Sequence, residues 1–291
     1  MSGEIVTISQ AVTMIKHDIE HAIINGSYTI KGEYVKDGNE AKNNLIRSQG
    51  PINHIHQAVK SSFIQHGVNP SYIKPPLGTT AEELCVYGFV KKKDQDVCVL
   101  PNNVEQHEEI LSFDGILKGE VDPLGFNYTE RVLSVNVRSQ LSSIAKNFDT
   151  LYERTFAEPL NFHLRCPRMV LGEVYLIPVF EYDDALAKSN IVGFKPNASV
   201  RTHIEKYISS FSAINMRQSI QGNEIKYERA CLLIVDFRED VPHIYNTDEE
   251  LKAAGLLSPR AAISINDLTF DGLVPRLLNV YSQRFGEGRF I

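Results

Sequence analysis

The chain has 291 residues, a formal net charge of −6 and 43% hydrophobic residues. This composition is typical of a packed globular protein and excludes a disordered chain, and the acidic balance does not by itself indicate a nucleic-acid partner. No apolar run approaches the roughly 18 residues of a membrane span, and the amino terminus lacks the basic and apolar regions of a signal peptide. We therefore expect a soluble cytoplasmic protein with no membrane partner.

The cysteines are far apart in the chain and form no C-x-x-C pair: Cys85, Cys98, Cys166 and Cys231. Each lies in or beside an apolar run, so we expect four buried thiols in a reducing compartment.

Two helices are expected in the first 67 residues. Residues 8–24 repeat isoleucine and valine on one helical face, with a capping-box sequence before them and Gly26 after them. The polar residues 31–44 are rich in Gly, Asp and Asn, which predicts an exposed loop or hairpin. Residues 51–67 begin with Pro and end with Gly, which frames a second helix whose inward face is Ile52, Ile55, Val59 and Phe63.

Strands dominate the next part of the chain. Two β-branched runs around a polar turn predict a hairpin of Leu84–Val90 with Val97–Leu100. In residues 133–138, aliphatic and polar side chains alternate, which predicts a half-buried strand with Ser134, Asn136 and Arg138 on its solvated face.

The remaining segments alternate between helix and strand. Residues 169–180 and 230–237 are almost continuously apolar, which predicts strands buried on both faces. Helical spacing of apolar residues predicts helices at 141–155, 198–213 and 273–285. With no linker or internal repeat, the order indicates one α/β domain, a mixed central sheet flanked by helices, with helical additions at its amino terminus.

This order of elements resembles the core of PD-(D/E)xK nucleases, in which one Asp and one acidic residue bind a divalent cation and a Lys acts near the scissile phosphate. Asp96 stands at the start of a predicted strand and matches the first metal ligand of the family. The sequence Asn136–Val137–Arg138 stands where the family has (D/E)xK. The resemblance implies a restriction-endonuclease-like core at 51–240, between a helical and loop extension at 1–50 and a helical extension at 241–291. The chain departs from the family at two positions, with Asn136 in place of the acidic residue and Arg138 in place of the Lys. Both differences matter, because an amide is a weaker Mg²⁺ ligand than a carboxylate and a guanidinium cannot serve as a base.

Residues 131–184 are also similar to sequences identified as restriction endonucleases. This resemblance implies a type II enzyme of restriction-modification defence in a bacterial or archaeal cell, hydrolysing phosphodiester bonds in a short sequence of double-stranded DNA with Mg²⁺. A homodimer is expected because typical targets have two-fold symmetry. The alternative is a catalytically inactive DNA-binding or adaptor protein on the same fold.

On this hypothesis, Asp96 binds the metal, Asn136 holds the metal or its bound water, Arg138 clamps the scissile phosphate and Gln140 contacts DNA beside it. Alternatively, Asn136 and Arg138 decorate a solvated sheet face, and Arg138 pairs with Glu153 or Glu158. Four residues could supply a further carboxylate ligand: Glu130, Glu153, Glu158 and Glu173. Glu173 interrupts an apolar strand, so it must reach water at the strand mouth, which we favour, or meet a cation or metal.

Two polar clusters could contact phosphates. Lys91, Lys92 and Lys93 are expected in a turn, where solvated lysines are common. The strand-to-helix junction offers a second set, although one ordinary capping serine would account for part of it: Ser139, Gln140, Ser142, Ser143 and Lys146. His54 and His56 are two residues apart and therefore point to opposite sides of a helix, which argues against a zinc site.

Overall fold

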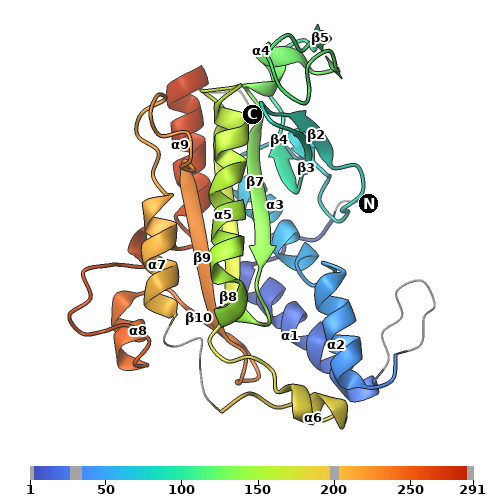
Figure 1. The fold of residues 1–291 in the computed structure, drawn as a ribbon, viewed down its shortest axis with the longest axis vertical. Coiled ribbons are helices and arrows are strands. Elements are labelled where there is room, and N and C mark those ends of the chain that lie inside the picture. Colours follow the sequence, from blue (N-terminus) through green and yellow to red (C-terminus); the bar gives the residue numbers. More distant parts are fainter. Residues whose placement is uncertain (1–2, 27–34, 197–202, 287–291) are drawn as a thin grey trace.

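The structure is a computed structural model that describes residues 3–26, 35–196 and 203–286, without the side chains of residues 145–147. A six-stranded mixed sheet lies at its centre in the order β1-β4-β7-β8-β9-β10 (Figure 1). Its strands are β1 (Ile73–Lys74), β4 (Val97–Val99), β7 (Leu133–Ser139), β8 (Val170–Pro178), β9 (Arg229–Asp236) and β10 (His243–Tyr245). β7, β8 and β9 are parallel, and the other neighbours are antiparallel. The predicted α/β class with a mixed central sheet is confirmed.

Helices cover both faces of this sheet. On one face, α1 (Ile8–Asn25), α3 (Asn53–Gln65) and α9 (Leu273–Phe285) share a buried cluster with Val135, Val174 and Leu233. On the other face, α5 (Ile144–His163) and α7 (Ile204–Ala213) pack against Leu171, Tyr175 and Leu232 (Figure 1). The shorter helices are α2 (Gly38–Arg47), α4 (Gly125–Thr129), α6 (Asp184–Lys188), α8 (Asp248–Ala253) and the 3₁₀ turns η1 (Pro70–Tyr72) and η2 (Asn266–Leu268).

The first predicted helix is confirmed together with its ends. Thr7 Oγ1 accepts a hydrogen bond from Gln10 N at 3.2 Å, and Thr7 N donates to Gln10 Oε1 at 2.8 Å, which completes the capping box. Gly26 follows α1 in the left-handed conformation that favours glycine. The predicted inward face of α3 is also buried.

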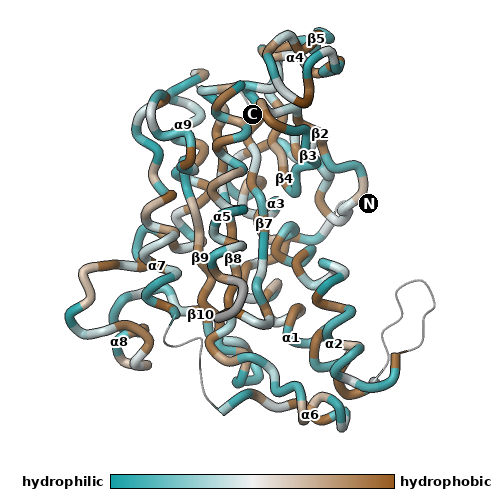
Figure 2. The backbone as a smooth tube through the Cα atoms, viewed as in Figure 1, coloured by the Kyte–Doolittle hydropathy of each residue, from teal (hydrophilic) through white to brown (hydrophobic). Residues whose placement is uncertain are grey.

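The prediction of a loop or hairpin at 31–44 is wrong for its described part, because α2 begins at Gly38. Residues 31–34 lie outside the described residues. Asp37 caps α2 by accepting a hydrogen bond from Glu40 N at 2.8 Å. The helix has few aliphatic side chains, and much of its length is hydrophilic (Figure 2). It buries Lys42 against Asp184 at 2.6 Å instead. Packing on α1 and α6 thus selects a helix that its own sequence pattern does not indicate.

The predicted hairpin has a different second strand. β2 (Leu84–Tyr87) pairs with β3 (Lys92–Gln95), whereas Val97–Val99 forms β4 of the central sheet. The extended run from Lys92 to Val99 therefore changes partners at Asp96, and Lys92 and Lys93 lie in a strand rather than in a turn. A separate small sheet joins β5 (Glu109–Ile110) to β6 (Val121–Asp122).

Several further expectations are corrected. Cys85 is half-buried, while the other cysteines are buried, and all four are free thiols. The helix expected at 198–213 is described from Ile204 to Ala213, and residues 198–202 lie outside the described residues. The segment 241–291 contributes β10 to the sheet and α9 to its cover, so it is part of the packed core rather than an appendage. Among the described helices, none is both long and apolar enough to cross a bilayer.

A substitution at Gly38 tests the docking of α2. A Cβ atom at this position would lie 2.2 Å from the carbonyl oxygen of Ile23 and 2.7 Å from that of Ala187. Because both obstacles are backbone atoms, we expect Gly38→Ala to lower the free energy of unfolding by about 2 kcal/mol. Urea denaturation measures this change. Asn44→Ala in the same helix is the control and should change stability by no more than about 0.5 kcal/mol; equal effects would contradict the packing of α2.

Candidate functional site

The polar face of β7 is covered rather than solvated. Ser134 and Asn136 are completely buried, which corrects the prediction of a half-buried strand. α5 and β3 pack over this face, and they bring their own polar side chains to it. Ser134 Oγ, for example, donates a hydrogen bond to Gln95 Oε1 at 2.6 Å.

Asp96 lies where the run from β3 to β4 changes partners. Its carboxylate is half-buried, and Oδ2 accepts a hydrogen bond from Val137 N at 2.7 Å. The residue is thus fixed against β7 between Asn136 and Arg138. The structure therefore brings Asp96 next to Asn136 and Arg138, although about 40 residues separate it from them in the sequence.

An ion network fills the space between β7 and α5. Arg138 Nη1 contacts Glu173 Oε1 at 2.7 Å, and its Nη2 pairs with Glu158. Lys93 also pairs with Glu158, and its Nζ lies 3.3 Å from Asn136 Oδ1. The predicted alternative, in which Arg138 pairs with Glu158, is what the structure shows. The favoured placement of Glu173 at a solvated strand mouth is wrong, because its side chain is completely buried and meets a cation.

The two carboxylates of this network have opposite pKa shifts. Burial raises the pKa of Glu173 to about 8, although the nearby Arg138 opposes the shift. Burial also acts on Glu158, but its contacts with Arg138 and Lys93 outweigh it, so the pKa of Glu158 lies below its ordinary value. The same two cations act on both carboxyl groups, but Glu158 also accepts a hydrogen bond from Lys93, whereas the pKa of Glu173 is raised further by the negative charge of Glu158.

Two buried polar atoms in the same place have no hydrogen-bond partner among the described residues: Asn136 Nδ2 and Glu173 Oε2. Asn136 and Glu173 are paired positions on the neighbouring parallel strands β7 and β8. An unsatisfied donor and acceptor in the interior are costly, and they are frequent where a protein binds a ligand or water. The network therefore has unused bonding capacity for a polar group.

A second group of titratable side chains surrounds Asp96. Desolvation raises the pKa of Glu83, and the negative charges of Asp96 and Asp94 raise it further. From α3, Lys60 donates to the carbonyl oxygen of Thr79 at 2.7 Å, and burial lowers the pKa of Lys60 to about 8. Burial also lowers the pKa of His56, against the attraction of Asp96.

The two histidines of α3 point in different directions, as predicted. His54 contacts Asp18 at 2.7 Å, whereas His56 is buried on the side of Asp96. In the part of the chain that the structure describes, no group of three or more His, Cys, Asp or Glu residues is arranged to hold a metal ion.

Gln140 has a structural role that its sequence position does not reveal. Its Nε2 donates to the carbonyl oxygens of Ser143 and Ile144, both at 3.1 Å, and its Oε1 accepts from Tyr207 at 2.5 Å and from Tyr175 at 3.3 Å. Its amide is therefore bonded inside the protein, which does not support the predicted contact with DNA.

The other predicted DNA contacts are dispersed. Lys91 is exposed, and Lys92 pairs with Glu120 at 2.8 Å. Ser139 and Ser142 are half-exposed, and Ser143 precedes α5 without capping it through its side chain. The side chain of Lys146 lies outside the described part of the structure.

Two of the predicted alternative carboxylates are not part of the network. Glu130 lies at the end of α4 and accepts a hydrogen bond from Arg168 N at 3.2 Å. Glu153 is exposed on α5. Of the four alternatives, Glu158 and Glu173 are therefore the ones that the structure brings to Arg138.

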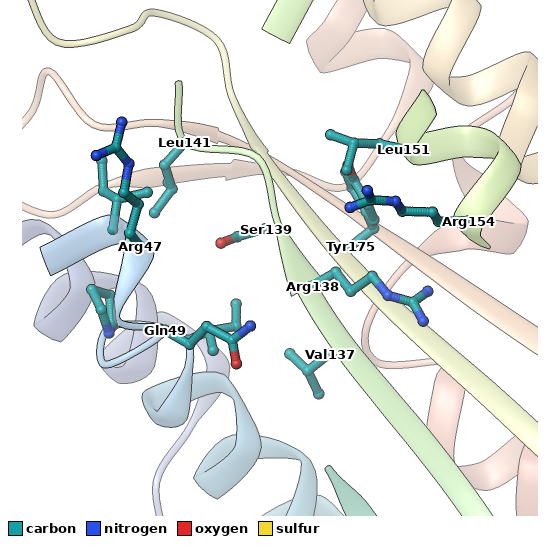
Figure 3. Close-up of a pocket in the computed structure, with 12 residues that line it drawn as sticks. Arg47, Gln49, Val137, Arg138, Ser139, Leu141, Leu151, Arg154 and Tyr175 are labelled. Carbon is teal, nitrogen blue, oxygen red and sulfur yellow. The ribbon is translucent and has the colours of Figure 1, made fainter. Parts of the chain in front are cut away.

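A cavity of 530 Å³ opens beside the network, between the α2–α3 turn, the end of β7 and α5 (Figure 3). Twelve residues line it, and they include Arg47, Arg138 and Arg154 but no acidic residue. Ser139 and Gln49 also line it, so one predicted DNA-contacting serine does face a basic cavity.

Sequence reasoning missed Arg47, Gln49 and Arg154, and it placed Lys93 in the wrong element. The burial of Glu158 could be predicted from the sequence, because Glu158 lies three residues after Thr155 and so continues the inward helical stripe of Phe148, Leu151 and Thr155. A charged residue on a buried stripe needs a partner, so its pairing with the next strand is predictable from helical geometry.

Comparisons with protein-family models, with curated proteins and with solved structures find no match to this chain.

The role of Arg138 in the network can be measured by its removal. We expect Arg138→Ala to lower the free energy of unfolding by about 3 kcal/mol, because it leaves the Glu173 carboxyl without a cation. The pKa of Glu173 is already raised, so its contribution to stability is present at low pH and is lost as the pH rises through about 8. The destabilisation by Arg138→Ala should therefore be larger at pH 9 than at pH 6.

Chemical denaturation of Arg138→Ala and of Arg138→Ala/Glu173→Gln at pH 6 and pH 9 tests the predicted pH dependence of the destabilisation. The second change should restore part of the stability and abolish the pH dependence of the difference. If Arg138→Ala is as stable as the original chain at both pH values, the ion pair does not hold β7 and β8 together.

Proposed function

We propose that this chain is a Mg²⁺-dependent endonuclease that hydrolyses phosphodiester bonds in double-stranded DNA. The observation that carries the proposal is the position of Asp96, which is hydrogen-bonded to Val137 N between Asn136 and Arg138. Val137 and Arg138 also line the arginine-containing cavity. The central sheet and its covering helices give α3, β1, β4, β7, α5 and β8 in chain order, with β2, β3, β5, β6 and α4 inserted between them. This order supports the proposal, because it resembles that of PD-(D/E)xK nucleases, although the strand expected at Leu84–Val90 lies outside the central sheet. An acidic residue and cations next to a basic cavity suit the binding of a phosphodiester.

In this proposal, the chain supplies part of the Mg²⁺ coordination and the substrate and water supply the rest. Mg²⁺ in phosphate-processing sites uses one or two carboxylates together with phosphate oxygens and water, so a full cage of protein ligands is not required. Asp96 would hold it, with Asn136 as a neutral oxygen ligand in place of the family's second acid. The unpartnered amide nitrogen of Asn136 is a hydrogen-bond donor, so it would contact a phosphate or water oxygen rather than the metal. When bound, Mg²⁺ supplies electrostatic stabilisation of the charge that develops on the phosphate.

The (D/E)xK motif of the family ends in a Lys, and this chain has Arg138 at that position. We propose that Lys93, which comes from β3, supplies the missing ammonium group. Its Nζ contacts Asn136 Oδ1 and Glu158, so it lies beside the residue that takes the place of the family's acid. In the proposed reaction, Lys93 donates hydrogen bonds to the scissile phosphate, and Arg138 remains with Glu158 and Glu173 to hold the site in shape. The resemblance at 131–184 extends the proposal to a type II restriction endonuclease that acts as a homodimer in bacterial or archaeal cytoplasm.

A second candidate function has its own supporting observation. Asn136 and Arg138 are engaged in a network in which Glu158 and Glu173 bond to Arg138 and Lys93, and these side chains pair with one another without any ligand. A DNA-binding protein that has lost the metal site would keep this network and the basic cavity. Such a protein would bind DNA equally well with and without a divalent cation.

Removal of the Asp96 carboxylate separates these candidates. We expect Asp96→Ala to reduce Mg²⁺-dependent cleavage of phage DNA at least a thousandfold while DNA affinity changes less than threefold, because a metal ligand is lost and the phosphate contacts remain. Discrete bands on gels report cleavage, and fluorescence anisotropy with Ca²⁺ reports binding. Asp240→Ala, an exposed acid on another loop, is the control and should cleave normally. Unchanged cleavage by Asp96→Ala would refute the metal-site assignment.

Substitution of Lys93 tests whether the network is also catalytic. We expect Lys93→Met to lower the single-turnover cleavage rate about a hundredfold, because the scissile phosphate loses an ammonium donor. Lys118→Met, which breaks a solvent-exposed pair with Asp114, should leave the rate unchanged. Melting temperatures of both variants show whether folding is intact. If Lys93→Met is fully folded and cleaves at the original rate, Lys93 has no part in the reaction.

A further inference from the structure

The basic cavity beside the ion network is built from three separate parts of the chain. Arg47 and Gln49 come from the turn between α2 and α3, Ser139 ends β7, and Arg154 projects from α5 (Figure 3). The cavity has a volume of 530 Å³, within the range of roughly 300–1,000 Å³ in which proteins bind small molecules. These polar groups belong to elements that are distant in sequence, so their convergence is a property of the folded chain.

The charge around this cavity is strongly one-sided. Three arginines and no acidic residue line it, in a chain whose formal net charge is −6. Arg138 is neutralised by Glu158 and Glu173, but no ion pair engages Arg47 or Arg154 among the described residues. Both of these side chains are exposed. Figure 3 shows Arg47 and Arg154 on opposite sides of the cavity, so each guanidinium group can meet a different part of an anionic ligand such as a phosphate ester.

The other side chains are too apolar for a site that takes an inorganic ion alone. Half of the lining is aliphatic or proline: Ile46, Pro51, Ile52, Val137, Leu141 and Leu151. Figure 3 shows the amide of Gln49 and the hydroxyl of Ser139 directed toward the space between the α2–α3 turn and β7, while the guanidinium of Arg138 is turned away from Gln49. An apolar enclosure with one amide suits a nucleobase, whose faces are apolar and whose edge forms hydrogen bonds.

The backbone at Gln49 gives independent support. Gln49 has φ of 61°, in the left-handed region that non-glycine residues rarely adopt. Glycine would be the least strained residue here, and yet the chain carries a long amide side chain that faces the cavity. Strain of this kind is often found at ligand sites, where the position of a side chain matters more than stability.

We propose that this cavity binds one nucleotide, with the phosphate at Arg154 and the base against the aliphatic wall beside Gln49. The nucleotide could enter as a unit of a DNA strand, extruded from its stack, or as a free 2′-deoxynucleoside monophosphate; the phosphate and base chemistry is shared. Entry from DNA rests on the proposed function. Binding itself does not, because the cavity is formed without a metal ion and without any cleavage step.

The test is calorimetric titration of the full chain in metal-free buffer containing a chelator. The ligands are the four 2′-deoxynucleoside 5′-monophosphates, inorganic phosphate, the four deoxynucleosides and a single-stranded oligonucleotide of mixed sequence. We expect at least one monophosphate to bind tenfold or more tightly than phosphate or its own nucleoside. Competition by the oligonucleotide would identify the DNA strand as the source, and its absence would identify the free nucleotide.

Three variants make the assignment specific to this cavity. Gln49→Gly removes the amide and relieves the backbone strain, so it should weaken monophosphate binding at least tenfold while the melting temperature stays equal or rises. Arg154→Ala should weaken it similarly, and the exposed Arg260→Ala is the matched control that should not. Absence of binding by all four monophosphates, or binding of inorganic phosphate as tight as theirs, would overturn the nucleotide site. Loss of cleavage in a chain that still binds nucleotide would refute only the proposed nuclease.

Discussion

The charge balance behind β7 is the constraint on which the rest of this structure depends. Glu158 and Glu173 are both buried, and each would be costly without a cation nearby. Arg138 and Lys93 supply the cations, and they come from a central strand and from a hairpin that leaves the sheet. The network therefore ties α5, β3 and β8 to one strand, in a layer where the neighbouring contacts are mostly aliphatic and aromatic.

The same network bears on both candidate functions, the nuclease and the DNA-binding protein without a metal site. A group that binds at Asn136 must compete with Lys93 for the Asn136 carbonyl oxygen, and a phosphate that approaches Lys93 must compete with Glu158. A catalytic site would use this competition, since an ammonium group released from a carboxylate is ready to bind an anion. A structural network would resist it, because the separated carboxylate would remain buried without its partner.

The hydrophobic pattern predicted those elements whose own sequence indicates their structure without knowledge of their packing partners. β8 and β9 are largely apolar and rich in Val, Leu and Ile, which predicts interior strands, and α1 carries its own capping signals. The pattern failed for α2 and β3, whose sequences are polar and whose structure is selected by packing against α6 and β2. It also failed for the polar face of β7, since alternation shows that two faces differ but not that the polar one is exposed. The pairing of Arg138 with Glu158 was among the alternatives, whereas the contribution of Lys93 depended on a strand partner that the sequence did not reveal.

The run from Lys92 to Val99 serves two sheets at once, and this has a mechanical consequence. Asp96 is anchored to Val137 N and moves with the central sheet, while Lys93 belongs to the hairpin of β2 and β3. The turn of that hairpin is held by α5, because Asn161 Oδ1 accepts hydrogen bonds from Val90 N at 2.7 Å and from Lys91 N at 3.0 Å. The hairpin is therefore fixed at its turn and at Asp96, and this keeps the Lys93 ammonium group next to Glu158, which lies about one turn before Asn161 on the same helix.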